Sequence, residues 1–186
     1  GMVGVLRTVT ADAGQVLGGA VEPVARLLRG LIESGLAITI AGSSRPASGC
    51  EHHASHFWDL LADRGSRPHH PHGLQVGYAT WFAMQLQRFA FGGGVARLRT
   101  PVAPSEPLGP AARRWLGEPS SHVLAAVAEK QGFVAELGHW PKDEQGWESV
   151  QERIAPALEL FGNVQAALRR ARIPAEPGYL DVDEPT

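Results

Sequence analysis

Histidine, the side chain best suited to chemistry in this sequence, is unevenly distributed. Six of the eight histidines lie between positions 52 and 72, namely His52, His53, His56, His69, His70 and His72. On an α-helix, His52 and His56 are four residues apart and project from one face, so they can offer two imidazole nitrogens to one metal ion. An antiparallel return of the chain would bring His72 back over this pair. The spacing therefore makes this region a candidate metal site.

Other interpretations of these residues stay open at this point. A pair of histidines four apart is also typical of a helix surface, or of a core in which backbone carbonyls satisfy the rings. His53 is rotated by about 100° from His52 on a helix, so we expect it outside the site. His69 and His70 lie in a polar loop and are expected to be solvated. Glu51 is a candidate to hydrogen-bond a ligating histidine or to act as an acid or base.

The remaining chemically notable residues favour packing. Cys50 is the only cysteine, so no disulfide within the chain can form and the sequence is typical of the cytoplasm. As a soft-metal ligand Cys50 is the less favoured alternative, and a small packed residue is the more favoured one. The five tryptophans are expected in the core and at its rim: Trp58, Trp81, Trp115, Trp140 and Trp147.

Apolar periodicity predicts helices that would carry the histidines. Val24, Leu27, Leu28 and Leu31 recur at helical spacing after Pro23, and this helix should end at Gly42. Its last turns, residues 36–40, are apolar nearly all round and are expected to be buried. A second helix should begin near residues 48–50 and end near residue 63. A third should run from about residue 72 to the glycines at 92–94.

The rest of the chain also indicates helices. We expect a short one near 111–116, another over 121–130 and a long one over 143–172 that Pro156 kinks or splits. Residues 1–20 are predicted to be a loosely ordered lead-in, residues 21–175 a helical domain, and residues 176–186 a peripheral tail. No stretch alternates as a strand would. The fold class predicted is all-α, a bundle of about five to seven helices with the histidine helix near its centre.

Two motifs make the metal hypothesis more specific. The string GSSRPASGCEHHASH spans residues 42–56, and HGLQVG spans residues 72–77. Together they resemble the glycerol-1-phosphate dehydrogenase family, within a superfamily that includes glycerol dehydrogenase, iron-containing alcohol dehydrogenases and dehydroquinate synthase. The strong part of the resemblance covers residues 36–82. It implies the fold of the C-terminal, helical, metal-binding domain of these enzymes.

The resemblance also implies roles for individual residues. His52 and His72 match the two histidines that ligate zinc, or iron in some relatives, and the metal acts as a Lewis acid on the substrate alcohol. His56 matches a histidine that lines the active site and is not normally a ligand. Residues 43–49 match a loop that closes over the site beside the substrate, a small phosphorylated polyol. Within that loop, Arg45 is expected either to meet a phosphate or to cap loop carbonyls.

The sequence departs from the family in two ways. The family's third ligand is an Asp on an earlier helix, and the only nearby Asp before the motif, Asp12, lies in a segment that does not resemble it. No glycine-rich phosphate loop or dinucleotide-binding domain is visible. We therefore expect zinc to be weakly held, and NAD(P) to bind only if a separate nucleotide-binding domain supplies its site. The chain by itself is expected to be inactive.

Composition limits the partners. The formal net charge of −2 gives no reason to expect nucleic acid, and no apolar run approaches the ~20 residues that span a membrane. A homodimer is expected, because apolar surface left without its covering helices would favour self-association, and residues 36–40 are expected to form part of that surface. Two alternatives to the dehydrogenase hypothesis stay open: a non-enzymatic remnant or partner-binding helical domain, and part of a dehydroquinate synthase-like enzyme that forms carbocycles.

Overall fold

The computed structural model describes residues 2–44, 47–65, 67–92, 108–117 and 143–173, together with residues 121, 123–125, 127–128, 175–176, 178 and 180. Every regular element in these residues is a helix, and none of them is in a strand. The prediction of an all-α fold is confirmed. Within the same residues, no helix is both long and apolar enough to cross a bilayer.

Helix α3 spans Val21–Ala41, close to the predicted bounds. Pro23 is buried in its first turn, where a missing backbone N–H costs nothing. Gly42 ends the helix with φ of 62°, a left-handed conformation that glycine adopts without the steric penalty of a side chain. Proline near the start and glycine at the end therefore account for both boundaries of this helix.

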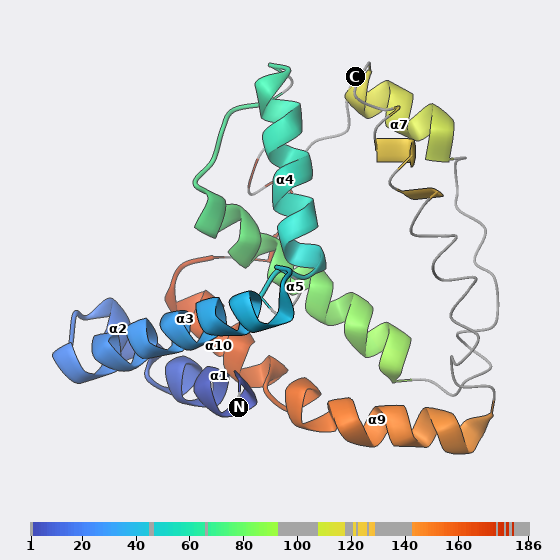
Figure 1. Cartoon of the computed structure of the whole chain (residues 1–186). Coiled ribbons are helices and arrows are strands. Elements are labelled where there is room, and N and C mark those ends of the chain that lie inside the picture. Colours follow the sequence, from blue (N-terminus) through green and yellow to red (C-terminus); the bar gives the residue numbers. More distant parts are fainter. Residues whose placement is uncertain are drawn as a thin grey trace.

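Helices α4 (Cys50–Asp63) and α5 (His72–Phe91) form the centre of the molecule, and both begin and end near the predicted residues. Among the described helices they pack against each other most extensively, and Figure 1 shows them crossing near the base of α4. Their contact contains the main core cluster, made of Trp58, Leu61, Tyr78, Ala79, Leu116 and Leu180. Burial of these large apolar side chains holds the two helices together.

Three helices flank this centre. Helix α7 (Leu108–Leu116) lies beside α4 and contributes the buried Leu116. Helix α9 (Glu144–Leu158) begins where the Asp143 carboxylate accepts a hydrogen bond of 2.8 Å from the Gly146 N–H. Helix α10 (Phe161–Arg170) follows after two residues, so the predicted long helix is split just beyond Pro156. Phe161 joins Trp81 and Met84 in a second core cluster.

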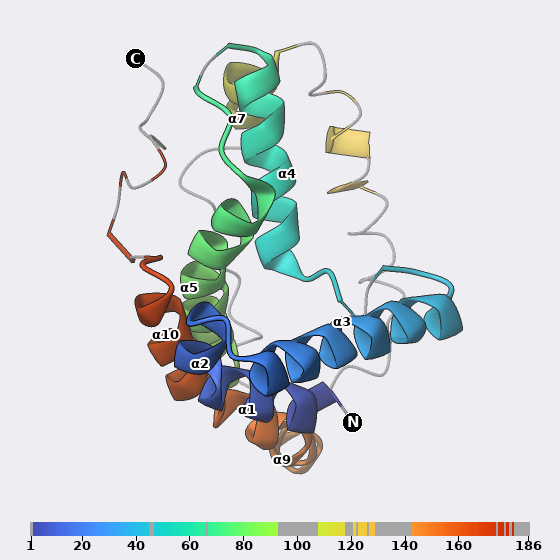
Figure 2. The same cartoon turned by 90° about the vertical axis from the view of Figure 1, so that its left-hand side faces the viewer.

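The amino-terminal residues differ from the expected loose lead-in. They form α1 (Met2–Ala11) and α2 (Ala13–Leu17), which lie beside α3 and α10 (Figure 2). The approach of α1 to α3 depends on Gly30, because a Cβ atom there would lie 2.5 Å from Cγ1 of Val5. Residues rich in Gly, Ala and Thr have weak periodicity of their own, so this contact between helices was not visible in the sequence.

The prediction that residues 36–40 are buried is wrong. Leu36 is 56% exposed and Ile40 is 87% exposed. Figure 2 shows why: the C-terminal half of α3 extends beyond α1. An apolar helix end without a neighbouring element remains open to solvent, however suitable its residues are for a core.

The tail, expected to be peripheral from residue 176 onward, is attached to α5 at its described residues, as is Ile173 just before it. Tyr78 donates a hydrogen bond of 2.9 Å to the backbone carbonyl of Glu176, and the indole of Trp81 donates one of 3.2 Å to that of Ile173. Leu180 is fully buried in the main core cluster. Burial, together with the charge of Glu176, raises the pKa of Tyr78, so its phenol stays protonated as a donor.

Candidate metal centre

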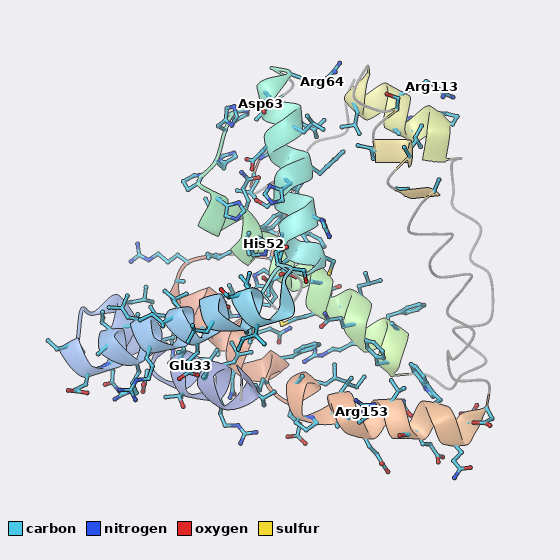
Figure 3. All side chains as sticks on the ribbon, viewed as in Figure 1. Glu33, His52, Asp63, Arg64, Arg113 and Arg153 are labelled. Atoms are coloured by element: carbon cyan, nitrogen blue, oxygen red, sulfur yellow. The ribbon has the colours of Figure 1, made fainter. Side chains whose placement is uncertain are left out.

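The first turns of α4 and α5 position the histidines. Helix α4 begins at Cys50, and the Glu51 carboxylate accepts a hydrogen bond of 2.8 Å from the Gly49 N–H just before it. This contact fixes the entry to the helix that carries His52 and His56 one turn apart. Helix α5 begins at His72, directly after Pro71. Figure 3 shows His52 near the base of α4, where α5 crosses it.

The structure brings His52, His56 and His72 together. The ring centres of His52 and His72 are 5.2 Å apart, those of His56 and His72 are 5.6 Å apart, and those of His52 and His56 are 6.4 Å apart. The ring planes are tilted by 30–59° to one another, so no two of these rings stack face to face. Their juxtaposition follows from the turn between α4 and α5. That His52 and His72 bind metal stays a prediction.

Both predicted ligands use Nδ1 for a contact within the protein. Nδ1 of His72 shares a hydrogen bond of 2.9 Å with the hydroxyl of Ser55, which is fully buried. Nδ1 of His52 lies 3.2 Å from the Glu51 carboxylate. Metal-ligating histidines usually donate one ring N–H in this way, which fixes the ring and leaves the other nitrogen for the ion. The geometry thus leaves Nε2 of both rings for a ligand.

The Glu51 carboxylate is held in its charged form. Burial alone would raise its pKa, but hydrogen bonds from the backbone N–H groups of Glu51 and Gly49, and the hydrogen bond and charge of His52, bring the pKa below its ordinary value. A charged carboxylate at Nδ1 fixes the orientation of the His52 ring and leaves its opposite nitrogen for a ligand.

A buried amide fixes the junction behind the histidines. Nε2 of Gln75 donates to the Asp59 carboxylate at 2.6 Å and to the His70 carbonyl at 2.9 Å, and the Gln75 side chain is almost completely buried. One side chain therefore ties α5, α4 and the connecting loop to one another. This network limits how far the start of α5, with His72, can move relative to α4.

The other sequence candidates lie outside the cluster or outside the described residues. His53 is exposed and absent from the ring contacts, as expected. His69 is exposed beside Asp63, with its Nε2 3.2 Å from the carboxylate, whereas Nε2 of His70 is buried and not solvated as expected. Cys50 is exposed and not packed. Arg45 and Pro46 lie outside the described residues, so the role assigned to Arg45 stays a prediction.

No set of three or more His, Cys, Asp or Glu side chains in the described part of the chain is already arranged to hold an ion. The two predicted ligands nevertheless fit zinc in donor type, because imidazole is a common zinc ligand and both rings have their Nδ1 occupied. Sequence reasoning identified Glu51 as a supporting residue but missed Ser55. The sequence signal that could have identified Ser55 was its position between His52 and His56, directly before His56.

Comparison with known proteins finds glycerol-1-phosphate dehydrogenases among the relatives of this chain. The chain is 36% identical over 148 residues to a glycerol-1-phosphate dehydrogenase [NAD(P)+] of Methanothermobacter thermautotrophicus, a match that covers 75% of this chain and 38% of the relative. It is 47% identical over 62 residues to the same enzyme of Halalkalibacterium halodurans, which covers 33% of the chain and 16% of that protein. It is 46% identical over 74 residues to the Pyrococcus abyssi enzyme, which covers 40% of the chain and 20% of the relative.

These matches are partial. They span between 16 and 38% of the length of the relatives. No family model matches the chain, and no solved structure matches it. Over the matched stretches the chain is related to the glycerol-1-phosphate dehydrogenases, and the resemblance predicted from its two histidine motifs is confirmed.

Proposed function

We propose that this chain is the helical metal-binding part of a glycerol-1-phosphate dehydrogenase-like, NAD(P)-dependent oxidoreductase, and that His52 and His72 hold its zinc ion. One observation carries the proposal. The rings of these two residues, 20 positions apart in sequence, lie 5.2 Å apart with each Nδ1 occupied by Glu51 or Ser55. Such pairs of ring and supporting acceptor are typical of metal-binding histidines.

A bound zinc ion would supply Lewis acidity to a substrate oxygen. The chain's own residues orient the two histidine rings and fix the helices that carry them. Glu51 and Ser55 orient the two rings through their Nδ1 atoms. His56 lies within 6.4 Å of both rings, and it is a titratable group on the same helix face. Gln75 ties the start of α5 to α4 through Asp59 and to the connecting loop through the His70 carbonyl.

The relatives' names supply the remaining parts of the proposal, a phosphorylated glycerol as substrate and NAD(P) as the hydride carrier. The NAD(P) site would come from a nucleotide-binding domain that these 186 residues do not supply, as a further segment or a separate chain. Arg45, which precedes α4 in the sequence, is proposed to meet the substrate phosphate. The single cysteine agrees with a reducing compartment, and we propose the cytoplasm.

Zinc binding by the 186-residue chain tests the proposal. We expect the wild type to bind Zn²⁺ in a competition titration with a chromogenic chelator, and His52→Ala and His72→Ala each to weaken binding by at least roughly 10–100-fold. His53→Ala is the matched control, since His53 is on the same helix but exposed and outside the cluster. Equal affinity of all four proteins would contradict the proposed site.

Turnover gives an independent test. With added zinc, dihydroxyacetone phosphate and NAD(P)H, the chain alone should show no oxidation of the nicotinamide at 340 nm. Positioning of cofactor against substrate can supply about 7–11 kcal/mol of barrier reduction, and a metal site alone does not provide it. Turnover by the chain alone that His52→Ala abolishes would disprove the expected inactivity. Activity that appears only with an added nucleotide-binding protein would support the proposal that this chain holds the metal and another domain holds NAD(P).

A second candidate function is a helical domain that binds a protein partner without catalysis. The observation in its favour is the exposed apolar surface of α3, where Leu28, Leu31, Ile32, Leu36 and Ile40 are 54–87% exposed. The matches to dehydrogenases and the paired histidines favour the oxidoreductase. They also make the carbocycle-forming synthase the weaker alternative. A wild-type chain that self-associates or binds a protein partner but binds no zinc would favour the non-enzymatic domain.

A further inference from the structure

We propose that the junction of α5, α10 and the tail is a second binding site, which takes the phosphate group of a small molecule through Arg169 and Arg172. The junction contains a pocket of about 320 Å³. Two guanidinium groups and one carboxylate contribute to its lining, which consists of Trp81, Arg169, Arg172, Ile173, Ala175 and Glu176. Two positive charges and one negative charge leave an excess of positive charge, which favours an anionic ligand.

The backbone at Arg172 is the first observation in favour of this site. Helix α10 ends in a Schellman motif, in which the Ile173 N–H donates to the Leu168 carbonyl at 2.9 Å. Arg172 takes the left-handed position of this motif, with φ of 58°, and is the only described residue other than glycine with a positive φ. Glycine usually occupies this position, because a Cβ atom raises the energy of the left-handed conformation. An arginine at such a position points to a role for its side chain.

Stabilisation of the helix does not explain Arg172. Positive side chains near the C-terminal end of a helix interact favourably with its dipole, and Arg169 and Arg170 already supply two of them in the last turn of α10. Arg172 would add less, because the effect of the dipole falls off within that turn. A side chain that gains little from the helix and strains the backbone is better explained by a ligand.

Arg169 is the second observation, because its side chain is oriented before a ligand binds. Its guanidinium lies over the Trp81 ring, 5.2 Å from the ring centre. Trp81 is itself buried, and its indole donates a hydrogen bond of 3.2 Å to the Ile173 carbonyl. The cation–π contact therefore holds Arg169 on a rigid support. A guanidinium that is already oriented loses less conformational entropy when its paired N–H donors bind a phosphate.

The pocket also limits the ligand. Its volume is at the lower end of the range of about 300–1,000 Å³ for small-molecule sites. Glu176 would repel a ligand that is negative on every side, but its carboxylate can accept a hydrogen bond from a hydroxyl or ammonium group. The ligand class that fits is therefore a small phosphorylated molecule that carries a hydroxyl or amino group.

This pocket is separate from the histidine cluster. Trp81 follows His72 by nine residues of the continuous helix α5, a rise of about 13 Å at about 1.5 Å per residue. A phosphorylated glycerol held at the histidines is shorter than this distance. The ligand at the junction would therefore be an additional molecule, and its binding would join α5, α10 and the tail. This inference goes beyond the proposed oxidoreductase function and does not depend on it.

The test is a titration of the full 186-residue chain with inorganic phosphate, without zinc and at constant ionic strength in chloride. The indole N–H resonance of Trp81, assigned by its loss in Trp81→Phe, should shift in a saturable way in the wild type. Arg172→Gly should weaken phosphate binding by roughly tenfold or more, because hydrogen bonds to a charged group are lost. The same variant should leave the Tm unchanged or raise it, because glycine relieves the left-handed backbone. A structural role for Arg172 predicts a lower Tm.

Arg170→Gln is the matched control, since Arg170 is exposed at the same helix end and outside the pocket lining. It should bind phosphate as the wild type does. Equal weakening by Arg170→Gln would mean that phosphate responds only to net charge, and it would overturn the site. A wild-type resonance that does not shift, or normal binding by Arg172→Gly, would overturn it as well. None of these outcomes involves zinc, so failure of this site leaves the proposed function standing.

Discussion

Helix α3 and the pair α4–α5 are both rich in apolar residues, but they use them in opposite ways. Helix α4 buries Trp58, Leu61 and Ala62, and the first two share a core cluster with Tyr78 and Ala79 of α5. Helix α3, the longest of the described helices, buries only Pro23 and Gly30. Most of its larger apolar side chains remain exposed, from 54% at Leu28 to 87% at Ile40.

The two regions differ in whether residues of this chain cover their apolar surfaces. The α4–α5 pair contains the histidine cluster and forms its core from its own residues, with help from α7 and the tail. Helix α3 has an inner face that meets α1 and an outer face whose apolar side chains are more than half exposed. A helix that is apolar on two sides is normally covered on two sides. The candidate chemistry and the candidate contact surface are therefore in different layers of the molecule.

The largest effect should come from the α4–α5 core. Trp58→Ala removes a buried ring that packs 5.8 Å from Tyr78 and carries the Arg67 guanidinium 5.7 Å from its centre. We expect a loss of about 3–5 kcal/mol in the free energy of unfolding. The counterpart on α3, Ile32→Ala, should change it by less than about 0.5 kcal/mol, since Ile32 is 65% exposed. Urea denaturation at low protein concentration measures both free energies of unfolding. Similar losses in the two variants would contradict the difference in burial between α4 and α3.

Two glycines within α3 sharpen the same comparison between its faces. Gly30→Ala places a Cβ atom 2.5 Å from Cγ1 of Val5, a β-branched side chain that rotates little, and should cost about 1–3 kcal/mol as α1 is displaced. Gly35→Ala meets no atom within 4 Å and should stabilise the helix by about 0.5–1 kcal/mol. Thermal unfolding compares them. Changes of the same sign would mean that α1 does not pack on α3 as described.

The outer face of α3 suits a second copy of this chain, and we propose a homodimer there. Ile32 and Leu36 are equally far from position 34, so an antiparallel pairing about a two-fold axis brings Ile32 opposite Leu36 of the partner subunit. Such self-complementary spacing is what an interface between identical surfaces needs. The charged residues Arg29 and Glu33 lie to one side, in the groove against α1.

Introducing a charge into this face tests the dimer. Ile32→Glu should weaken self-association by roughly tenfold or more, because the carboxylate would be buried opposite leucine. Gln145→Glu adds the same charge at an exposed position of α9 and should have no effect. Sedimentation equilibrium measures the association constant. A wild type that remains monomeric at high concentration would refute the proposed pairing.

Local signals made much of this architecture predictable. Gly42, Pro71 and Asp143 mark a helix end and two helix starts because each acts through its own backbone or side-chain chemistry. The predicted grouping of His52 with His56 needed only the helical period. What the sequence did not reveal depends on contacts between distant segments. These features are the packing of α1 against Gly30, the exposure of Ile40, and the hydrogen bond between His72 and Ser55.

The attachment of the tail to α5 has a consequence for the order of events during synthesis. The contacts that join α4 to α5 connect residues only 16 or 17 positions apart, Asp59 with Gln75 and Ser55 with His72. Those from Trp81 and Tyr78 to the tail span 92 and 98 positions. A chain that leaves the ribosome from its amino terminus can therefore bring its histidines together early, while the far face of α5 remains uncovered until Ile173 and Glu176 emerge.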